Sequence, residues 1–253
     1  MRRIAIVNQK GGSGKTTTAV NLASTLVAAG KKVLLIDLDP QASASLWYGF
    51  KDKGKGLYDV FVENHRLENV IEKTGIDSLH IVAASPLLAG VEKALANEVA
   101  SEGILKDRLA NLPSCPWDYV LMDCPPTLGV LSLNALTLAD EVLIPVETHV
   151  MALHGLVQLL KTINVVKQRL NPSLVIAGIL ACRVDYRTKH AQEVLEQLKT
   201  RFDTKLYKSV IRENIKLAEA PLHLKPINLY DPNSNGSQDY RSLAKELIAQ
   251  EIS

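Results

Sequence analysis

The sequence has few cysteines, few aromatic residues and no long apolar run. Its 253 residues include 3 cysteines, and aromatic residues make up 5% of the chain. The cysteines lack the paired spacing of a zinc site, so we expect small buried side chains at Cys115, Cys124 and Cys182. No apolar stretch approaches the roughly 18 residues that a membrane span needs, and no secretory signal follows Met1. These absences exclude a disulfide scaffold and a membrane-spanning protein, and they predict a cytoplasmic protein.

Charge is almost balanced over the whole chain but not along it. Lysine and arginine number 29 and aspartate and glutamate 27, and 47% of the residues are hydrophobic. This composition and length predict a single α/β domain over residues 1–253. Residues 161–225, however, hold 13 basic and 6 acidic residues, a balance of +7. This segment is a candidate surface for a polyanion, although solvated helix faces without a ligand would have the same composition.

A glycine-rich stretch near the N-terminus carries the clearest chemical signal. The apolar run at 4–7 predicts a buried strand, and apolar positions between 19 and 27 recur at helical spacing before Gly30. Between them lies the sequence Lys10-Gly11-Gly12-Ser13-Gly14-Lys15-Thr16-Thr17. Three glycines let successive backbone N–H groups point inward, and the N-terminus of the following helix adds a partial positive charge. The stretch is therefore predicted to bind phosphate groups.

Individual residues of this loop indicate a nucleoside triphosphate. Lys15 can reach the β- and γ-phosphates, and Thr16 can offer its hydroxyl to Mg²⁺. The loop departs from the usual P-loop because Gln9 stands where its first glycine is expected, and a second lysine, Lys10, opens it. A dinucleotide-binding loop is excluded because Thr17 stands where its third glycine or alanine belongs. The simpler alternative is a glycine turn with incidental lysines.

Acidic residues follow two further apolar runs. The run at 32–36 leads into Asp37 and Asp39, and the run at 119–122 leads into Asp123. Ligands in α/β proteins bind at the carboxyl ends of parallel strands. Asp39 is the better candidate of the first pair for handling Mg²⁺ or the attacking water, and Asp123 has the place of a Walker B acid. With the glycine loop, these acids predict a nucleotide hydrolase.

The remaining pattern alternates strands with helices. Further strands are expected at 79–83, 141–146 and 175–180, helices at 87–112, 152–170 and 239–252, and a polar turn that enters a short helix at 51–60. Such alternation implies a mostly parallel, twisted sheet with helices on both faces. The predicted fold class is therefore α/β.

Taken together, the motifs closely resemble the ParA family of DNA-partition ATPases, part of the wider deviant Walker A group that includes MinD. The resemblance covers essentially the whole chain and runs in family order through residues 9–17, 37–41, 123–126, 133–136 and 213–221. It implies a P-loop NTPase fold of deviant Walker A type. It also implies ATP and Mg²⁺ as cofactors and a sandwich homodimer that forms on ATP.

The same resemblance implies roles for the loop and the acids. The loop would bind ATP, with Lys15 on the phosphates of its own subunit and Lys10 on those of the partner subunit. Asp39 would position the attacking water. Thr16 and Asp123 would hold Mg²⁺.

Roles outside the loop are implied as well. Asn214 would contact the adenine, and Arg187 and Lys216 match positions that bind the DNA backbone in ParA-like proteins. Backbone contacts of this kind are independent of sequence and sensitive to salt.

The implied function is DNA segregation. An ATP dimer would bind nonspecific DNA on the nucleoid and be released after hydrolysis, which a ParB-like adaptor would stimulate, so that plasmid or chromosomal DNA is moved. Three alternatives stay open: ParA-like positioning of a protein cargo, a MinD-like regulator that cycles on membranes, and a metabolic ATPase of the same fold. The basic segment and the lack of a basic amphipathic end helix favour DNA and no membrane partner.

Overall fold

Parallel strands form the centre of the molecule. The computed structural model describes residues 1–51 and 56–252. The strands are β1 (Arg2–Ile6), β2 (Val33–Asp37), β3 (Ile71–Lys73), β4 (Leu79–Val82), β5 (Tyr119–Asp123), β6 (Glu141–Glu147), β7 (Val175–Val184) and β8 (Ile211–Arg212). Within the described residues they form one eight-stranded sheet in the order β3-β4-β2-β5-β1-β6-β7-β8. All neighbours pair in parallel except β3 and β4. The mostly parallel sheet predicted from the sequence is confirmed.

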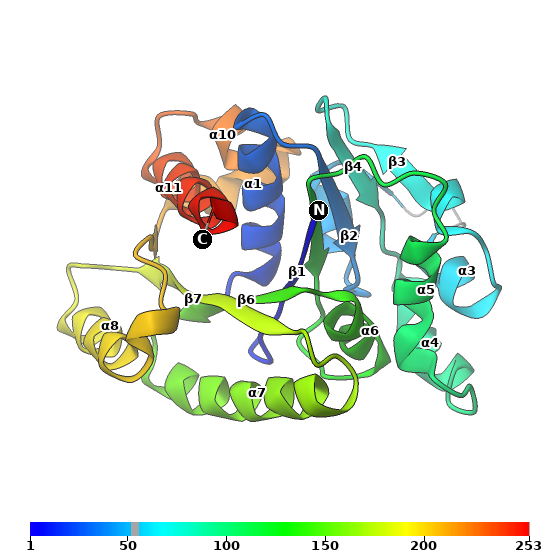
Figure 1. The fold of residues 1–253 in the computed structure, drawn as a ribbon. Helices are drawn as coiled ribbons and strands as arrows, with labels where there is room; N and C mark the ends of the chain where they lie inside the picture. The colour runs from blue at the N-terminus through cyan, green and yellow to red at the C-terminus, as the bar shows by residue number, and fades with distance from the viewer. Residues whose placement is uncertain (52–55, 253) are drawn as a thin grey trace.

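Helices cover both faces of this sheet (Figure 1). They are α1 (Lys15–Ala28), α2 (Ser43–Trp47), α3 (Leu57–Val62), α4 (Val91–Ala94), α5 (Ile104–Ala110), α6 (Val130–Leu138), α7 (Val150–Arg169), α8 (Lys189–Phe202), α9 (Ile215–Glu219), α10 (Ile227–Tyr230) and α11 (Asn235–Ala249). On one face α1 and α11 pack together, and on the other α6 and α7 do.

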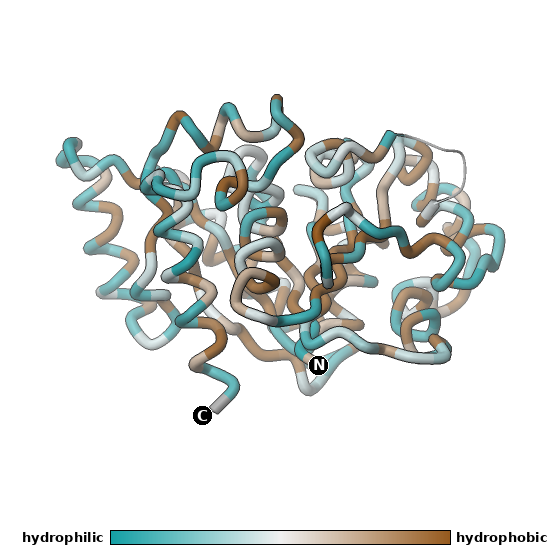
Figure 2. Tube along the Cα trace, turned by 90° about the horizontal axis from the view of Figure 1, so that it is seen from above, coloured by the Kyte–Doolittle hydropathy of each residue, from teal (hydrophilic) through white to brown (hydrophobic). Residues whose placement is uncertain are grey.

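Each face of the sheet has its own apolar core. Leu22 of α1 and Leu243 of α11 are buried on one side, and Leu159 of α7 and Val194 of α8 on the other. Strands β2 and β5 are buried along their whole length, as a sheet covered on both faces requires. Helices such as α8 and α11 carry both apolar and polar residues along their length (Figure 2), and their buried residues are mainly apolar, so each turns one face to a core.

The segment between β4 and β5 differs from the prediction. A single helix over 87–112 was expected, but the structure has the short helices α4 and α5 with 3₁₀ turns at Pro86–Gly90 and Ser101–Gly103. Residues 96–100 are all exposed, and Val99 is 91% exposed. These residues offer no apolar stripe to the sheet, so packing does not stabilise a continuous helix there.

Smaller expectations have mixed outcomes. Cys124 and Cys182 are buried as predicted, but Cys115 is exposed, so that part of the prediction is wrong. The short helix expected near residue 60 is α3, whereas residues 52–55 of the predicted polar turn lie outside the described residues. In the part of the chain that the structure describes, no helix is long and apolar enough to cross a membrane.

One glycine of β7 offers a test of the packing. A Cβ on Gly178 would lie 2.4 Å from Cε2 of Tyr207, whose side chain is buried. Gly178→Ala must therefore displace the ring, and we expect a loss of about 1–3 kcal/mol in the free energy of unfolding, measured with urea. Gly155→Ala, where nothing lies within 4 Å of the added carbon, is the control and should not destabilise. Equal stability of both variants would contradict this packing.

Candidate functional site

A pocket opens at the carboxyl end of β1, where the glycine loop connects this strand to α1. Its volume is about 900 Å³, and residues of the loop, of the segment after β2 and of β8 and α9 line it. Strand β1 lies between β5 and β6. Strands β2 to β5 lie on one side of it and strands β6 to β8 on the other, so the strand order changes direction at β1. This is the kind of position where open α/β sheets bind their ligands.

The loop has the conformation that its glycines predict. Gly12 and Gly14 have φ values of 77° and 91°, which side chains rarely adopt. Gly14 caps α1, and among the described residues no side chain caps this end and no acid lies in its first turn. The free N–H groups at the start of α1 are therefore available to an anion in the pocket, which Lys15, Thr16 and Thr17 also line.

Lys15 is a cation in a mostly buried place. It is 7% exposed, and its Nζ donates a 3.3 Å hydrogen bond to the carbonyl of Lys10. Burial lowers the pKa of Lys15, although the charges of Asp123 and Asp39 oppose this shift. An ammonium group with so few partners is suited to a phosphate ligand.

Asp123 at the end of β5 is a buried acid without a partner. It is fully buried, and neither carboxylate oxygen accepts a hydrogen bond from a described residue. Burial and the neighbouring Asp37 raise the pKa of Asp123 well above its usual value, while the Thr16 hydroxyl and Lys15 oppose the shift. A carboxylate in this state is costly unless a cation neutralises it. Asp123 and Thr16 thus fit Mg²⁺, whose preferred ligands are oxygens.

Two further acids follow β2. Asp39 lines the pocket and is half-buried, and its Oδ1 accepts a 2.9 Å hydrogen bond from the N–H of Gln41. Asp37 is fully buried and lies beside Asp123 in the paired strands β2 and β5. Burial raises the pKa of Asp37 to about 6, although hydrogen bonds from Ser45 and Asp39 oppose this. No role for Asp37 was predicted from the sequence.

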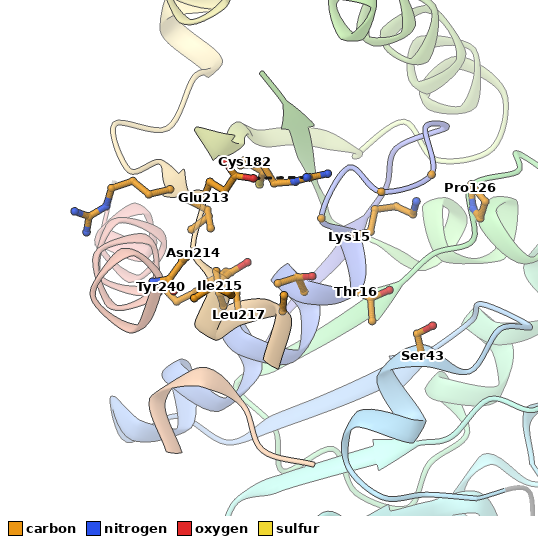
Figure 3. A pocket seen from close by; sticks show the side chains of 18 of the residues that line it. Lys15, Thr16, Ser43, Pro126, Cys182, Glu213, Asn214, Ile215, Leu217 and Tyr240 are labelled. Carbon is orange, nitrogen blue, oxygen red and sulfur yellow. Dashed lines mark ion pairs between the residues drawn. The ribbon is translucent and has the colours of Figure 1, made fainter. Parts of the chain in front are cut away.

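The opposite wall of the pocket is mostly apolar. Figure 3 shows Lys15 and Thr16 on one side and Asn214, Ile215 and Tyr240 on the other. Asn214, for which the resemblance implies an adenine contact, lines this wall, and its Oδ1 accepts the N–H of Lys216 at 2.8 Å at the start of α9. Such a wall suits the flat face of a nucleobase.

The apolar part of this wall was not predicted from the sequence. Its residues come from β8, α9 and α11, and a salt bridge of 2.6 Å between Arg212 and Asp239 holds β8 to α11. Tyr240 belongs to no motif, and Ile215 lies in the motif at 213–221 but was given no role there, so their place in this wall was not predicted.

Three predicted cations lie at the edge of the site or outside it. Lys10 is 41% exposed and pairs with Glu147 at 2.9 Å, so its amine does not enter the pocket of its own chain. Arg187 lines the pocket, although its side chain is 86% exposed and pairs with Asp185. Lys216 pairs with Glu219 at 2.9 Å on α9. The structure thus brings the loop, Asp39, Asp123 and Asn214 together and leaves these cations near the surface.

Ser13 is the one loop residue that is buried with an unpaired hydroxyl among the described residues. Gly11 and Gly12 are exposed and line the pocket. Of the predicted loop residues, Gly11, Gly12, Gly14, Lys15, Thr16 and Thr17 therefore line one cavity, and Lys10 and Ser13 do not.

Comparison with known proteins agrees with this geometry. A family model described as an AAA domain matches residues 1–176. The chain is 45% identical to the sporulation initiation inhibitor protein Soj of Bacillus subtilis, covering 97% of this chain and 98% of that protein. It is 42% identical to the chromosome-partitioning ATPase Soj of Treponema pallidum, covering 99% and 98%.

A solved structure shares the fold over the whole chain. Cobyrinic acid a,c-diamide synthase from Mycobacterium smegmatis, with a bound ATP analogue and magnesium, is 32% identical with a TM-score of 0.86, covering 100% of this chain and 96% of that one. The extent of these matches, together with the glycine loop and the buried acid, decides the family and the enzyme class. The chain belongs to the Soj/ParA family of chromosome-partitioning ATPases and hydrolyses ATP with Mg²⁺.

Proposed function

We propose that this ATPase dimerises on ATP, binds DNA without sequence preference and is released after hydrolysis, which a ParB-like adaptor stimulates. The observation that best supports the ATP and Mg²⁺ chemistry is the carboxylate of Asp123, which is buried and unpaired beside the start of α1. Relatives with 42–45% identity are named for chromosome partitioning or as Soj, which supports the biological part. The protein would then act on the nucleoid.

In this proposal the loop holds the triphosphate. The backbone N–H groups from Gly11 to Thr17 bind the phosphate oxygens, and Lys15 adds a charged contact. Thr16 and Asp123 would hold Mg²⁺, which neutralises charge on the phosphates when it is bound. Asn214 contacts the adenine at the apolar wall.

Asp39 orients the attacking water. Its carboxylate accepts a hydrogen bond from the water, whose oxygen attacks the γ-phosphorus as the bond to the bridging oxygen breaks. The products are ADP and inorganic phosphate. The partly exposed position of Asp39 at the pocket, unlike that of Asp37, allows contact with a water molecule.

Lys10 is proposed to act between subunits. Its amine lies outside the pocket of its own chain and is 41% exposed, so a second subunit can approach it. On dimerisation it would leave Glu147 and reach the partner's phosphates. The requirement for those phosphates makes the dimer depend on ATP.

Arg187 and Lys216 are proposed to contact the DNA backbone. Both lie in the basic segment 161–225 and keep exposed side chains. Arg187→Ala with Lys216→Ala should weaken binding to all sequences about equally and reduce the log–log salt slope by about 1 for each phosphate that is no longer neutralised. Fluorescence anisotropy with random-sequence DNA at several salt concentrations measures both effects. Lys106→Ala, an exposed lysine on α5 outside the segment, is the control.

Unchanged DNA affinity in the double variant would place the DNA surface elsewhere.

The likeness to the cobyrinic acid synthase favours a second candidate, a metabolic ATPase with a small-molecule substrate. Such an enzyme would bind ATP at the same residues but would not bind DNA. A protein cargo in place of DNA cargo would keep the DNA binding and change only the adaptor.

A further inference from the structure

Asp37 is a buried acid that the proposed hydrolysis does not use. It ends β2 two residues before Asp39 and is fully buried. Its Oδ1 accepts the backbone N–H of Asp39 at 3.1 Å. Its Oδ2 accepts both the N–H and the hydroxyl of Ser45, at 2.8 and 2.7 Å. The carboxylate therefore joins the two ends of the loop that carries Asp39.

Ser45 extends this network to the next strand. It is fully buried on α2, and its Oγ also accepts the N–H of Ala84, just after β4, at 2.8 Å. On the other side, the N–H of Leu38 donates to the carbonyl of Asp123 at 2.9 Å. The segment around Asp39 is thus tied to both strands that flank β2.

The loop between these contacts needs such support. Ala42, within it, has a φ of 53°, a conformation that residues with a Cβ rarely adopt. Asp39 accepts one hydrogen bond at its side chain from Gln41 and one at its carbonyl from Ala42, both within the loop itself. The side chain of Asp37, which stands at the end of β2, accepts the backbone N–H of Asp39. Among the described residues, this is the only side-chain contact that ties the backbone of Asp39 to the sheet.

We propose that Asp37, with Ser45 as its partner, is a positioning residue that sets the place of Asp39 for hydrolysis. The proposal rests on the role of Asp39 given above. Phosphate binding depends on the loop before α1, a different segment of the chain, so loss of the Asp37 network should slow hydrolysis and leave ATP binding intact. A purely structural role would lower stability without this separation.

The test compares two variants with a matched control. Asp37→Asn can still accept the Asp39 N–H but cannot accept both Ser45 donors, and Ser45→Ala keeps its N–H and loses its hydroxyl. A displacement of about 1 Å can cost about 100-fold in rate, so we expect kcat to fall roughly 10- to 100-fold while KM and the Kd of a fluorescent ATP analogue change less than about threefold. The control is Ser24→Ala. Ser24 is a buried serine of α1, away from Asp39, and its hydroxyl donates a 2.8 Å hydrogen bond to Asn228. This variant should lower the Tm as Ser45→Ala does and keep kcat.

Asp39→Ala is measured in the same assays. If it stops turnover while Asp37→Asn and Ser45→Ala hydrolyse ATP at the parent rate, the positioning role is wrong and the role of Asp39 stands. A fall of kcat and ATP affinity together, in step with the Tm, would also overturn the positioning role. Normal hydrolysis by Asp39→Ala would overturn both assignments.

Discussion

Lys15→Ala should reduce ATP binding by about 100-fold or more, the cost of removing a mostly buried charge from its ionic partner. Lys15 is 7% exposed and lines the pocket, and no other lysine lines it among the described residues. No other ammonium of the described residues is therefore placed to take over the contact. Isothermal titration with ATP and Mg²⁺ measures the loss.

Lys10→Ala is the matched control for this prediction. Lys10 belongs to the same loop, but its amine pairs with Glu147 outside the pocket. The variant should bind ATP as a monomer with nearly the parent affinity and fail to form the ATP-dependent dimer in analytical ultracentrifugation. Tight ATP binding by Lys15→Ala, or loss of ATP binding by Lys10→Ala, would contradict the assigned division of roles.

Asp39→Ala should separate binding from turnover. Asp39 lies at the pocket but is not part of the loop that we propose holds the phosphates, so ATP affinity should change little. Without an acceptor for the attacking water, we expect turnover to fall about 100-fold or more. Because release from DNA follows hydrolysis in the proposed cycle, the ATP dimer should accumulate on DNA.

Phosphate release and DNA retention test this prediction together. The Asp39→Ala protein is mixed with ATP and DNA, and the bound fraction is followed after the free ATP is removed. The parent protein should dissociate as it hydrolyses its ATP, and the variant should stay bound. Dissociation of the variant at the parent rate, with normal phosphate release, would assign the water to another residue.

The phosphate side of the proposed site could be predicted from sequence because the loop is one continuous stretch and each acid stands at the end of an apolar strand or just after it. Lys15 and Thr16 lie in one continuous stretch whose glycines dictate the backbone, and Asp39 and Asp123 follow apolar strands that end at the same edge of the sheet. Strand periodicity and the position of the acids were therefore enough to bring them together. The extent of a single domain over residues 1–253 stays a prediction.

Features that depend on tertiary contacts could not be predicted. The apolar wall with Ile215 and Tyr240 is assembled from separate elements, and the antiparallel edge strand β3 has only three residues. The expected helix over 87–112 failed because its apolar residues are too sparse near Val99 to pack against the sheet. The sequence pattern did not distinguish a role for Asp37 from that of the nearby Asp39. The role proposed for Asp37 depends on its contact with Ser45, which only the folded chain brings about.

The most direct measurement is binding of the purified protein to random-sequence DNA with ATP, with ADP and without nucleotide, with anionic liposomes in parallel. The proposed cycle predicts DNA binding with ATP only, weakened by salt, and no binding to liposomes. Equal DNA binding with ATP and ADP, or binding to liposomes in place of DNA, would contradict it. Binding to neither would contradict it as well and would favour the metabolic ATPase.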